Sequence, residues 1–469
     1  MNMRAFFGAL VFAACGLFAP AGAFAADAKA VAFSKGTDVG FMEDHTVPMI
    51  AMVISLPAGS AYDPKGKDGL ASYASSLMDE GAGNLDSDAY QSALNNRAIK
   101  LAASAERDYT VVSLVTLTEN APEAFRLLGL ALAHPRFDAG TVVRVRSQIV
   151  ASLQDDETEP ETVAAKAFFG IYFGGHPYAH SVSGTIPGVM AINMQDLKTF
   201  ARTHWVRGGM KVAVSGDLNE AKLRDYLKIA IGALPMQAPP WIQPVGKVGA
   251  PGVHVIPMPV PQPNVVFGVP GLLRNDKDFI PAYVANYILG GGGFSSRLTS
   301  EVREKRGLTY GIATSVTPFR KAGIVLGEMA TKRESVRQSI QVIRDTMKTF
   351  MNDGVTDKEL TDAKTYLTGS FPLAFTSNAG IASQLSAFQR AGLGIDYLAK
   401  RNALINAVTL DDVQRVAKRL FNPARLTIVV AGTPTQPQGS QKGPQKPKPA
   451  APAKPVQAQK PPVRSKPQP

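Results

Sequence analysis

Cysteine is almost absent from this sequence: Cys15 is the only one among 469 residues. It stands in an apolar run close to the N-terminus, so a chain cut after this residue has no thiol at all. Disulfide bonds, thiolate catalysis and cysteine-based metal sites are then excluded. The folded part of the chain must gain its stability from packing.

The N-terminal segment has the layout of a secretory signal peptide. Arg4 precedes an apolar run from Ala5 to Phe18, and small residues follow around 23–26. The run is too short to span a membrane. We therefore expect residues 1–26 to be removed on export, which would place the mature chain in the periplasm. The alternatives are a retained anchor and lipidation at Cys15.

Acidic residues are missing from the C-terminal tail, residues 435–469, which carries seven Lys or Arg residues. The net charge of the whole chain is +12, and subtracting these seven and Arg4 leaves about +4 for the body. The basic excess therefore belongs to the tail, and the body gives little electrostatic reason to bind nucleic acid. The tail is rich in proline and poor in large apolar residues, which predicts disorder. Its expected role is a solubilising extension or a contact with the anionic cell envelope.

Between its ends the chain repeats one plan twice. Alternating apolar residues mark strands, and a spacing of three to four residues marks helices. In the first copy these patterns predict strands at 47–59, 99–108, 109–117 and 210–218, and helices at 69–81, 120–133, 139–154, 160–172 and 219–234. In the second they predict strands at 263–271, 309–318 and 322–331, and helices at 279–291, 333–352, 356–369, 378–391 and 394–405.

The ends of the two copies also match. Residues 194–218, "MQDLKTFARTHWVRGGMKVAVSGDL", and residues 410–434, "LDDVQRVAKRLFNPARLTIVVAGTP", both follow the order helix, basic turn, strand and glycine. A segment rich in proline and glycine, 237–252, predicts a linker between them. We therefore expect an α+β fold of two homologous domains, 31–236 and 253–434, each a mostly antiparallel sheet covered by helices.

Three stretches resemble the pitrilysin or insulinase-type zinc peptidases, the family that includes the mitochondrial processing peptidase. They are "PAGSAYDPKGKDGLASYASSLMDEGAG" (57–83), "FGGHPYAHSVSGT" (173–185) and "LGGGGFSSRLTSEVREKRGLTYGIATS" (289–315). The resemblance spans roughly residues 31–434. It implies a chain that closes half of a peptide chamber.

The zinc motif of that family is missing from the matching helix. In the family the helix carries H-x-x-E-H, in which two histidines four residues apart bind one metal ion and the glutamate activates its water. Here Ser72 and Ser76 stand at the ligand positions, Ser75 at the position of the base, and Ser152 at or beside the third ligand. A neutral hydroxyl is a poor zinc ligand and no base near neutral pH. The resemblance therefore predicts no zinc in this chain.

The remaining residues do not predict another metal site. Of the six histidines, only His176 and His180 stand close together, and the proline between them makes helical spacing uncertain. His-Pro-Tyr is also a usual structural turn in the family. The acidic run at 155–161 fits a solvated helix start better than a calcium or zinc site. We therefore expect zinc only in a partner subunit, and no activity from this chain alone.

A different part of the family machinery is retained in "SSRLTSEVREKRGLTYG" (295–311). In the family, an arginine and a tyrosine seven residues apart reach across to the zinc site, hold the substrate backbone and help stabilise the oxyanion. Arg303 and Tyr310 match these positions. A guanidinium and a phenol can donate hydrogen bonds where negative charge develops. The alternative is an ordinary surface arginine and an ordinary strand tyrosine.

A run of four glycines allows two interpretations: Gly290, Gly291, Gly292 and Gly293. No Lys-Ser or Lys-Thr follows at P-loop spacing, so the run does not predict a nucleotide site. One interpretation is a flexible loop that Ser295 or Ser296 caps at a helix start. The other, implied by the resemblance to the non-catalytic subunit of the mitochondrial enzyme, is a loop that contacts substrate.

The zinc residues are lost while the substrate-contact pair is kept, and this asymmetry predicts a function. We expect a zinc-free partner subunit of an exported heteromeric zinc metallopeptidase, paired with an H-x-x-E-H sister chain that cleaves peptides or unfolded protein. A second hypothesis is a non-enzymatic scaffold or peptide-binding protein whose strand edges capture extended peptides. A third is independent catalysis at an unrelated metal site.

Overall fold

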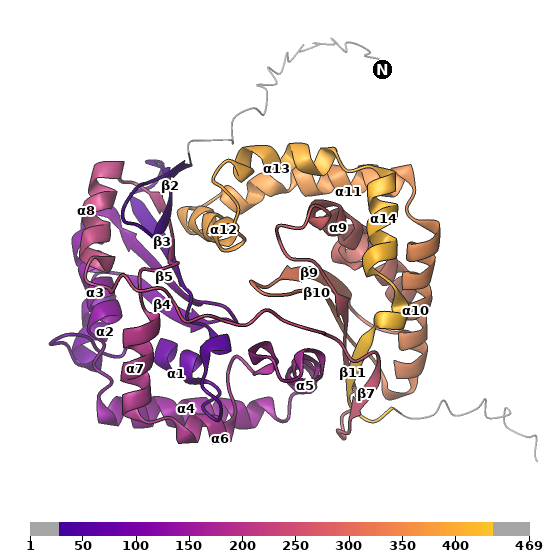
Figure 1. The fold of residues 1–469 in the computed structure, drawn as a ribbon, viewed down its shortest axis with the longest axis horizontal. Coiled ribbons are helices and arrows are strands. Elements are labelled where there is room, and N and C mark those ends of the chain that lie inside the picture. The colour runs from indigo at the N-terminus through magenta and orange to yellow at the C-terminus, as the bar shows by residue number, and fades with distance from the viewer. Residues whose placement is uncertain (1–27, 435–469) are drawn as a thin grey trace, which may run out of the picture.

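The computed structural model describes residues 28–434, which form two sheets surrounded by helices (Figure 1). The predicted signal peptide, residues 1–26, and the predicted tail, residues 435–469, lie outside the described residues. Within residues 28–434, no helix combines the length and apolar character needed to cross a membrane.

The first sheet has six strands in the order β1-β2-β6-β3-β5-β4. β2 and β6 run parallel, and the other neighbouring pairs are antiparallel. The central strand β3 is buried over seven of its eight residues, because helices cover both faces of the sheet. The strands are β1 (Lys29–Ala30), β2 (Asp38–Glu43), β3 (Met49–Leu56), β4 (Lys100–Ala105), β5 (Thr110–Leu117) and β6 (Lys211–Gly216).

The second sheet repeats this plan with five strands in the order β7-β11-β8-β10-β9. β7 and β11 run parallel and the rest antiparallel, as β2, β6, β3, β5 and β4 do in the first sheet. The predicted α+β fold of two similar, mostly antiparallel units is thereby confirmed. The strands are β7 (Gly252–Ile256), β8 (Asn264–Pro270), β9 (Ile312–Pro318), β10 (Gly323–Ala330) and β11 (Thr427–Ala431).

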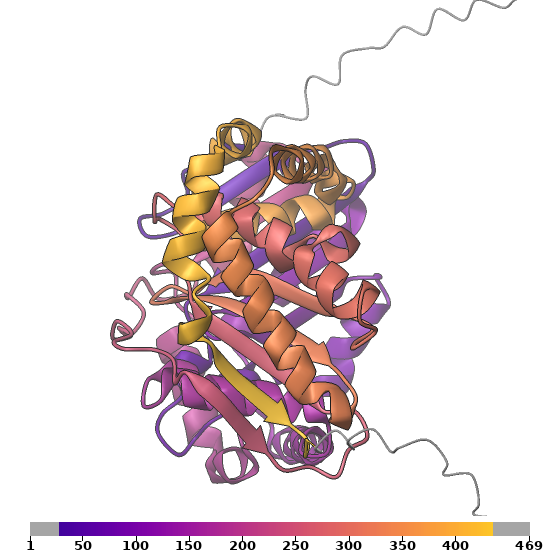
Figure 2. The ribbon, with the colours of Figure 1, turned by 90° about the vertical axis from the view of Figure 1, so that its right-hand side faces the viewer.

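Most helices lie close to the predicted ranges, but α1 is shorter than predicted, and α2 and α6 were not predicted. Those of the first half (residues 28–234) are α1 (Leu70–Ser76), α2 (Ser87–Asn95), α3 (Ala121–Ala133), α4 (Ala139–Asp156), α5 (Pro160–Phe173), α6 (Ile186–Ala191), α7 (Met194–His204) and α8 (Glu220–Ile231). Those of the second half (residues 252–434) are α9 (Phe279–Asn286), α10 (Val336–Asp353), α11 (Asp357–Gly369), α12 (Asn378–Arg390), α13 (Tyr397–Asn406) and α14 (Leu410–Leu420). Figure 2 shows α10 and α14 crossing the outer face of the second sheet.

Matching helices of the two halves begin in the same way. Asn193 and Asp196 form a capping box at the start of α7, and Thr409 and Asp412 form one at the start of α14. In each box the first side chain accepts a hydrogen bond from a free helix amide, and the acid accepts one in return. Both helices lead into the strand that lies parallel to its neighbour, β6 or β11.

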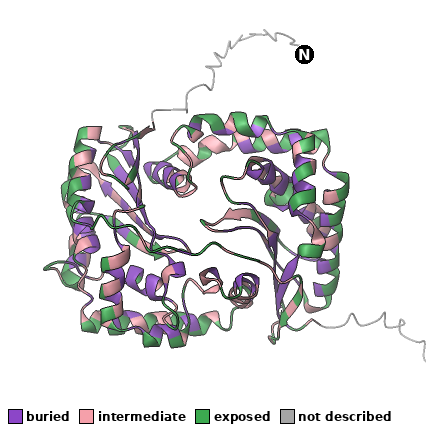
Figure 3. Cartoon of the chain, in the orientation of Figure 1, coloured by how far each residue is buried: buried purple, intermediate pink, exposed green. Residues whose placement is uncertain are grey.

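Each half lends one helix to the sheet of the other. α5 belongs to the first half, but its aromatic residues pack with Val266, Ile324 and Val429 of the second sheet. α12 belongs to the second half, and its Ile381 and Leu385 pack with residues of β2 and β6. Figure 1 shows both helices between the two sheets, and Figure 3 shows buried residues concentrated on the sheets and on the helices against them. This exchange fixes the halves against each other.

Candidate functional site

Helix α1, where the family carries its zinc motif, is anchored by a buried acid. The carboxylate of Asp63 accepts hydrogen bonds from the backbone amides of Gly69 (2.7 Å) and Ala71 (2.8 Å) at the helix start. Gly69 has a φ of 102°, in the left-handed region that glycine tolerates best. Burial raises the pKa of Asp63 to about 7, although these amides act in the opposite direction.

The serines on α1 are engaged with the fold itself. Ser75 is 2% exposed; its hydroxyl donates to the carbonyl of Ala71 (2.7 Å) and lies 3.3 Å from Thr110 Oγ1. Ser76 is exposed, and its hydroxyl donates back to the carbonyl of Ser72 (3.0 Å). Neutral hydroxyls bound to their own helix backbone make no ligand set for a divalent cation. These residues do not fit the family's zinc.

The other candidate metal ligands are also placed by the structure. Ser152 is exposed on α4. His176 caps the turn Pro177–Ala179, with its Nδ1 accepting from the amide of Tyr178 (3.1 Å), so the predicted structural turn is present. Within residues 28–434, no three His, Cys, Asp or Glu side chains lie close enough together to hold a metal ion.

The acidic run at 155–161 connects two helices. Asp156 ends α4 and forms an ion pair with Lys166 (2.8 Å), and Pro160 begins α5. The run therefore spans a helix end and a helix start, where acidic residues are favourable at the start because the helix amides are free.

Arg303 and Tyr310 lie at the two ends of one tight turn. Arg303 is on the π-helical turn Thr299–Glu304, and Tyr310 comes two residues before β9. The guanidinium of Arg303 stacks on the ring of Phe294, 4.5 Å from its centroid. Tyr310 is 90% exposed and Phe294 is 70% exposed. Arg303 therefore lies on an exposed aromatic ring, and Tyr310 has no role in the core.

Among residues 28–434, no carboxylate forms an ion pair with Arg303. Glu301, on the same turn, pairs with Lys305 and Arg306, each at 2.6 Å. The amide of Gly307 donates to the carbonyl of Arg303 (2.9 Å), which closes the turn behind it. The backbone of the turn is thus fixed by hydrogen bonds, while the guanidinium of Arg303 can still donate hydrogen bonds to a ligand.

The glycine run is a packed turn rather than a flexible loop. It continues α9 as the π-helical turn Tyr287–Gly291. A Cβ on Gly290 would lie 2.4 Å from Thr314 Oγ1 on β9, so only glycine fits there. Ser296 Oγ accepts a long hydrogen bond of 3.4 Å from the amide of Thr299, so Ser296 caps the helical turn that follows, as predicted. Gly291 and Gly293 are exposed.

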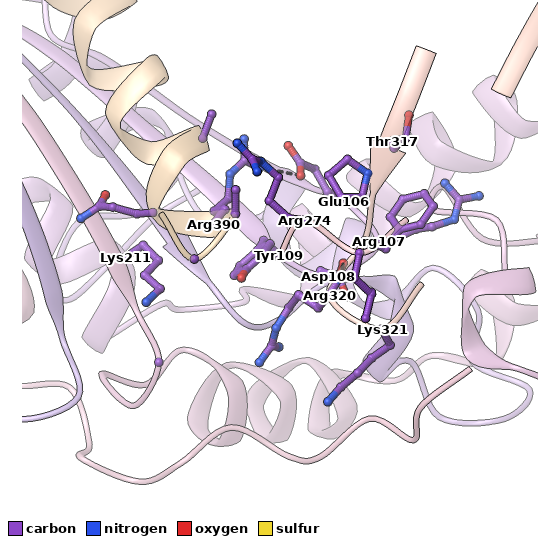
Figure 4. A pocket seen from close by; sticks show the side chains of 18 of the residues that line it. Glu106, Arg107, Asp108, Tyr109, Lys211, Arg274, Thr317, Arg320, Lys321 and Arg390 are labelled. Atoms are coloured by element: carbon purple, nitrogen blue, oxygen red, sulfur yellow. Dashed lines mark hydrogen bonds and ion pairs between the residues drawn. The ribbon is translucent and has the colours of Figure 1, made fainter. Parts of the chain in front are cut away.

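The structure also contains a cavity that sequence reasoning missed. It has a volume of about 1030 Å³ and lies where the β4–β5 turn, the β9–β10 turn and the end of α12 meet (Figure 4). Six basic side chains line it: Arg107, Lys211, Arg274, Arg320, Lys321 and Arg390. The only signal in the sequence is a pair of charged turns, 106–108 and 320–321, whose proximity depends on the packing of the halves.

Comparison with known proteins identifies the family. Residues 40–186 match the insulinase family of peptidases, peptidase family M16, and residues 191–367 match the peptidase M16 inactive domain. The chain belongs to the M16 family. It is 26% identical over 389 residues to the non-peptidase homolog YmxG of Helicobacter pylori. This alignment covers 81% of this chain and 87% of that protein.

Solved structures agree with this M16 assignment. A crystal structure of the peptidase M16 inactive domain from Pseudomonas fluorescens has a TM-score of 0.83 and 28% identity, and covers 88% of this chain and 99% of that one. A chain of complex III2 from Candida albicans shares the fold, with a TM-score of 0.74, 17% identity, and coverage of 87% and 96%. The predicted resemblance to this peptidase family is confirmed.

Proposed function

We propose that this M16 chain is the zinc-free subunit of an exported, heteromeric zinc metallopeptidase. The partner is an H-x-x-E-H chain that contributes the zinc ion, its ligands and the general base. This chain contributes Arg303 and Tyr310 to a peptide or unfolded protein segment held at that centre. The predicted signal peptide supports a periplasmic location, and the basic tail supports a contact with the envelope.

One observation carries the proposal: the two candidate sites differ in accessibility. Ser75, at the position of the base, is buried and hydrogen-bonded within the first half. Tyr310, at the position of the substrate contact, is 90% exposed, although tyrosine in a strand region ordinarily packs against neighbours. Phe294, the ring under the guanidinium of Arg303, is 70% exposed as well, and several exposed aromatic side chains in one region support a contact with a partner or ligand.

The chemistry of the pair suits amide hydrolysis. Negative charge develops on the carbonyl oxygen of the scissile peptide, and a guanidinium and a phenol can both donate to it. Removing one such donor costs about 3 kcal/mol of transition-state stabilisation, which is a rate loss on the order of a hundredfold. The glycine turn next to this pair, with Gly291 and Gly293 exposed, is a second candidate contact for the substrate backbone.

The test is peptide cleavage by a mixture of the purified mature chain and an H-x-x-E-H sister chain from the same organism. We expect neither chain alone to match the mixture. Arg303→Ala and Tyr310→Phe should each lower kcat/KM of the mixture, while complex formation measured by size exclusion is retained. Arg337→Ala, at an exposed arginine of α10, and Tyr366→Phe, at an exposed tyrosine of α11, are the matched controls. Parent-like cleavage by both site variants would refute the role.

A second candidate function is a non-enzymatic scaffold or peptide-binding protein. The fold likeness to a complex III2 chain favours it, as do β4 and β9, which stand at the edges of their sheets in the described part of the chain. An edge strand can accept an extended peptide by backbone hydrogen bonding. Peptide binding without cleavage, and no zinc-bearing chain among proteins that co-purify with the tagged mature chain, would favour this function over the first.

A further inference from the structure

The cavity between the halves carries positive charge that residues 28–434 neutralise only in part. Among the described residues, two of its six basic side chains have carboxylate partners: Arg390 with Glu106 (2.6 Å) and Lys211 with Asp38 (3.3 Å). Asp108 also lines the cavity, but its oxygens accept from the hydroxyl of Tyr178 and the amide of Arg320.

The four remaining cations make contacts that leave their charge in place. They are Arg107, Arg274, Arg320 and Lys321. Arg320 donates to the hydroxyl of Tyr62 (2.8 Å), and the guanidinium of Arg274 stacks 4.3 Å from the ring of Phe279. Lys321 lies 5.4 Å from the ring of Trp241. Burial lowers the pKa of Arg107 to about 10, although Asp108 acts in the opposite direction, and burial also lowers the pKa of Arg274. The pKa of Arg320 is raised, because Tyr62, Tyr109 and Asp108 outweigh its burial.

We propose that this cavity binds an acidic segment of a peptide, whose carboxylates pair with Arg320, Lys321 and Arg274. Figure 4 shows the side chains of Arg320 and Lys321 extending in the same direction from the β9–β10 turn, each ending in nitrogen. Guanidinium groups bind carboxylates through paired, directional hydrogen bonds. The assignment rests on the proposed function in one respect, because both require peptide to reach the inner surface of the chain.

The shape of the cavity favours a peptide over a small inorganic anion. Its volume of about 1030 Å³ equals that of a pocket for a large organic ligand. Arg320 and Lys321 come from one turn, whereas Arg274 follows β8 and Arg390 ends α12, and the rings of Tyr109 and Phe319 also line the cavity. Ala105 at the end of β4 and Thr317 near the end of β9 also line it, so a chain lying along either edge strand would lead into the cavity.

The experiment measures binding of two fluorescent peptides to the purified mature chain by anisotropy at low salt. The peptides are identical except that one contains several glutamates and the other contains glutamines at the same positions. We expect the glutamate peptide to bind about tenfold more tightly, and added salt to reduce the difference. Arg320→Gln combined with Lys321→Gln should remove most of this preference. Both substitutions keep the hydrogen bond from the backbone amide of residue 320 to the carboxylate of Asp108.

Matched controls separate the site from general charge. Arg337→Gln combined with Lys348→Gln removes the same charge from exposed positions on α10 and should leave the preference unchanged. A thermal melt of each variant checks folding. Equal affinity of the parent for both peptides, or no binding of either, would overturn the cavity assignment. Inorganic phosphate that displaces the glutamate peptide at equal concentration would overturn it too.

The two proposals fail separately. A lost glutamate preference leaves the effect of Arg303→Ala on cleavage untouched, because the cavity residues are not part of that turn. Unchanged cleavage by Arg303→Ala and Tyr310→Phe would refute the metallopeptidase role, while the glutamate preference of the isolated chain would persist.

Discussion

Asp108 of the first half accepts a hydrogen bond from the backbone amide of Arg320 in the second half, with 2.9 Å between Oδ2 and N. Its Oδ1 accepts from the hydroxyl of Tyr178 at 2.6 Å, and that hydroxyl accepts from the amide of Lys321 at 3.1 Å. Asp108 is 6% exposed, and burial raises its pKa. One buried carboxyl therefore connects the β4–β5 turn with the β9–β10 turn and so helps to set the walls of the basic cavity.

Removal of this carboxyl should destabilise the junction. We expect Asp108→Ala to lower the free energy of unfolding by about 2 to 4 kcal/mol, because two buried donors lose their acceptor. Urea denaturation followed by circular dichroism measures the loss. Asp345→Ala, at an exposed aspartate of α10, should change stability by less than about 0.5 kcal/mol. Equal losses in the two variants would contradict the bridging role.

The anchor of α1 should make stability depend on pH. The pKa of Asp63 is raised from 3.8 to about 7. The protonated carboxyl therefore stabilises the fold fully below the unfolded pKa, and this contribution is lost as the pH rises through about 7. Between about pH 5 and about pH 8 the loss from this group is roughly 2 to 3 kcal/mol. Urea unfolding at both pH values should show a smaller drop for Asp63→Asn than for the parent, and a parent-like drop for Asp345→Asn.

Periodicity was sufficient for most elements of the fold, but it missed the short elements β1, α2 and α6 and one strand of each parallel pair. The ranges of α3, α4, α5 and α11 agree with prediction to within about two residues, because their apolar spacing is regular. β2 and β7 are absent from the sequence prediction. Each is a short strand that gains its place by parallel pairing with a strand more than a hundred residues away, β6 or β11, and local pattern contains no record of such a partner.

Which sheet a helix covers was equally hidden from the sequence. The apolar faces of α5 and α12 predict burial, but not that each packs on the sheet of the other half. The side chain of Gln389 on α12 holds this helix on the first sheet, because its amide donates to the backbone carbonyls of Asp38 and Val212, both at 3.1 Å. The basic cavity depends on that packing, since Arg390 is the last residue of α12. The candidate residues Arg303 and Tyr310, in contrast, lie in one short segment and follow from the resemblance to the family, because the family's pair is also seven residues apart.

Crowding at the glycine run gives a test of its rigidity. We expect Gly290→Ala to destabilise the protein by about 1 to 3 kcal/mol, because the new methyl would lie 2.4 Å from Thr314 Oγ1. Gly170→Ala, inside α5 with no atom within 4 Å of the added Cβ, should leave stability unchanged or raise it by up to about 1 kcal/mol. Thermal unfolding compares the two. A flexible run, as one sequence interpretation held, would tolerate both changes alike.

Restoring the glutamate of the zinc motif should damage the fold before it can restore any chemistry. Ser75 is 2% exposed, so Ser75→Glu replaces the hydroxyl with a methylene and a carboxylate in a closed region between α1 and β5. Overpacking and the burial of a charge together predict a loss of about 3 kcal/mol or more in the free energy of unfolding. Ser76→Glu is the matched control, because Ser76 makes the same bond to the carbonyl four residues back but is exposed. We expect it to cost less than about 1 kcal/mol. Urea unfolding of both variants shows whether the fold still has room for a glutamate at position 75. If Ser75→Glu is as stable as Ser76→Glu, the region can accommodate a general base. The loss of zinc chemistry then depends only on the missing metal ligands.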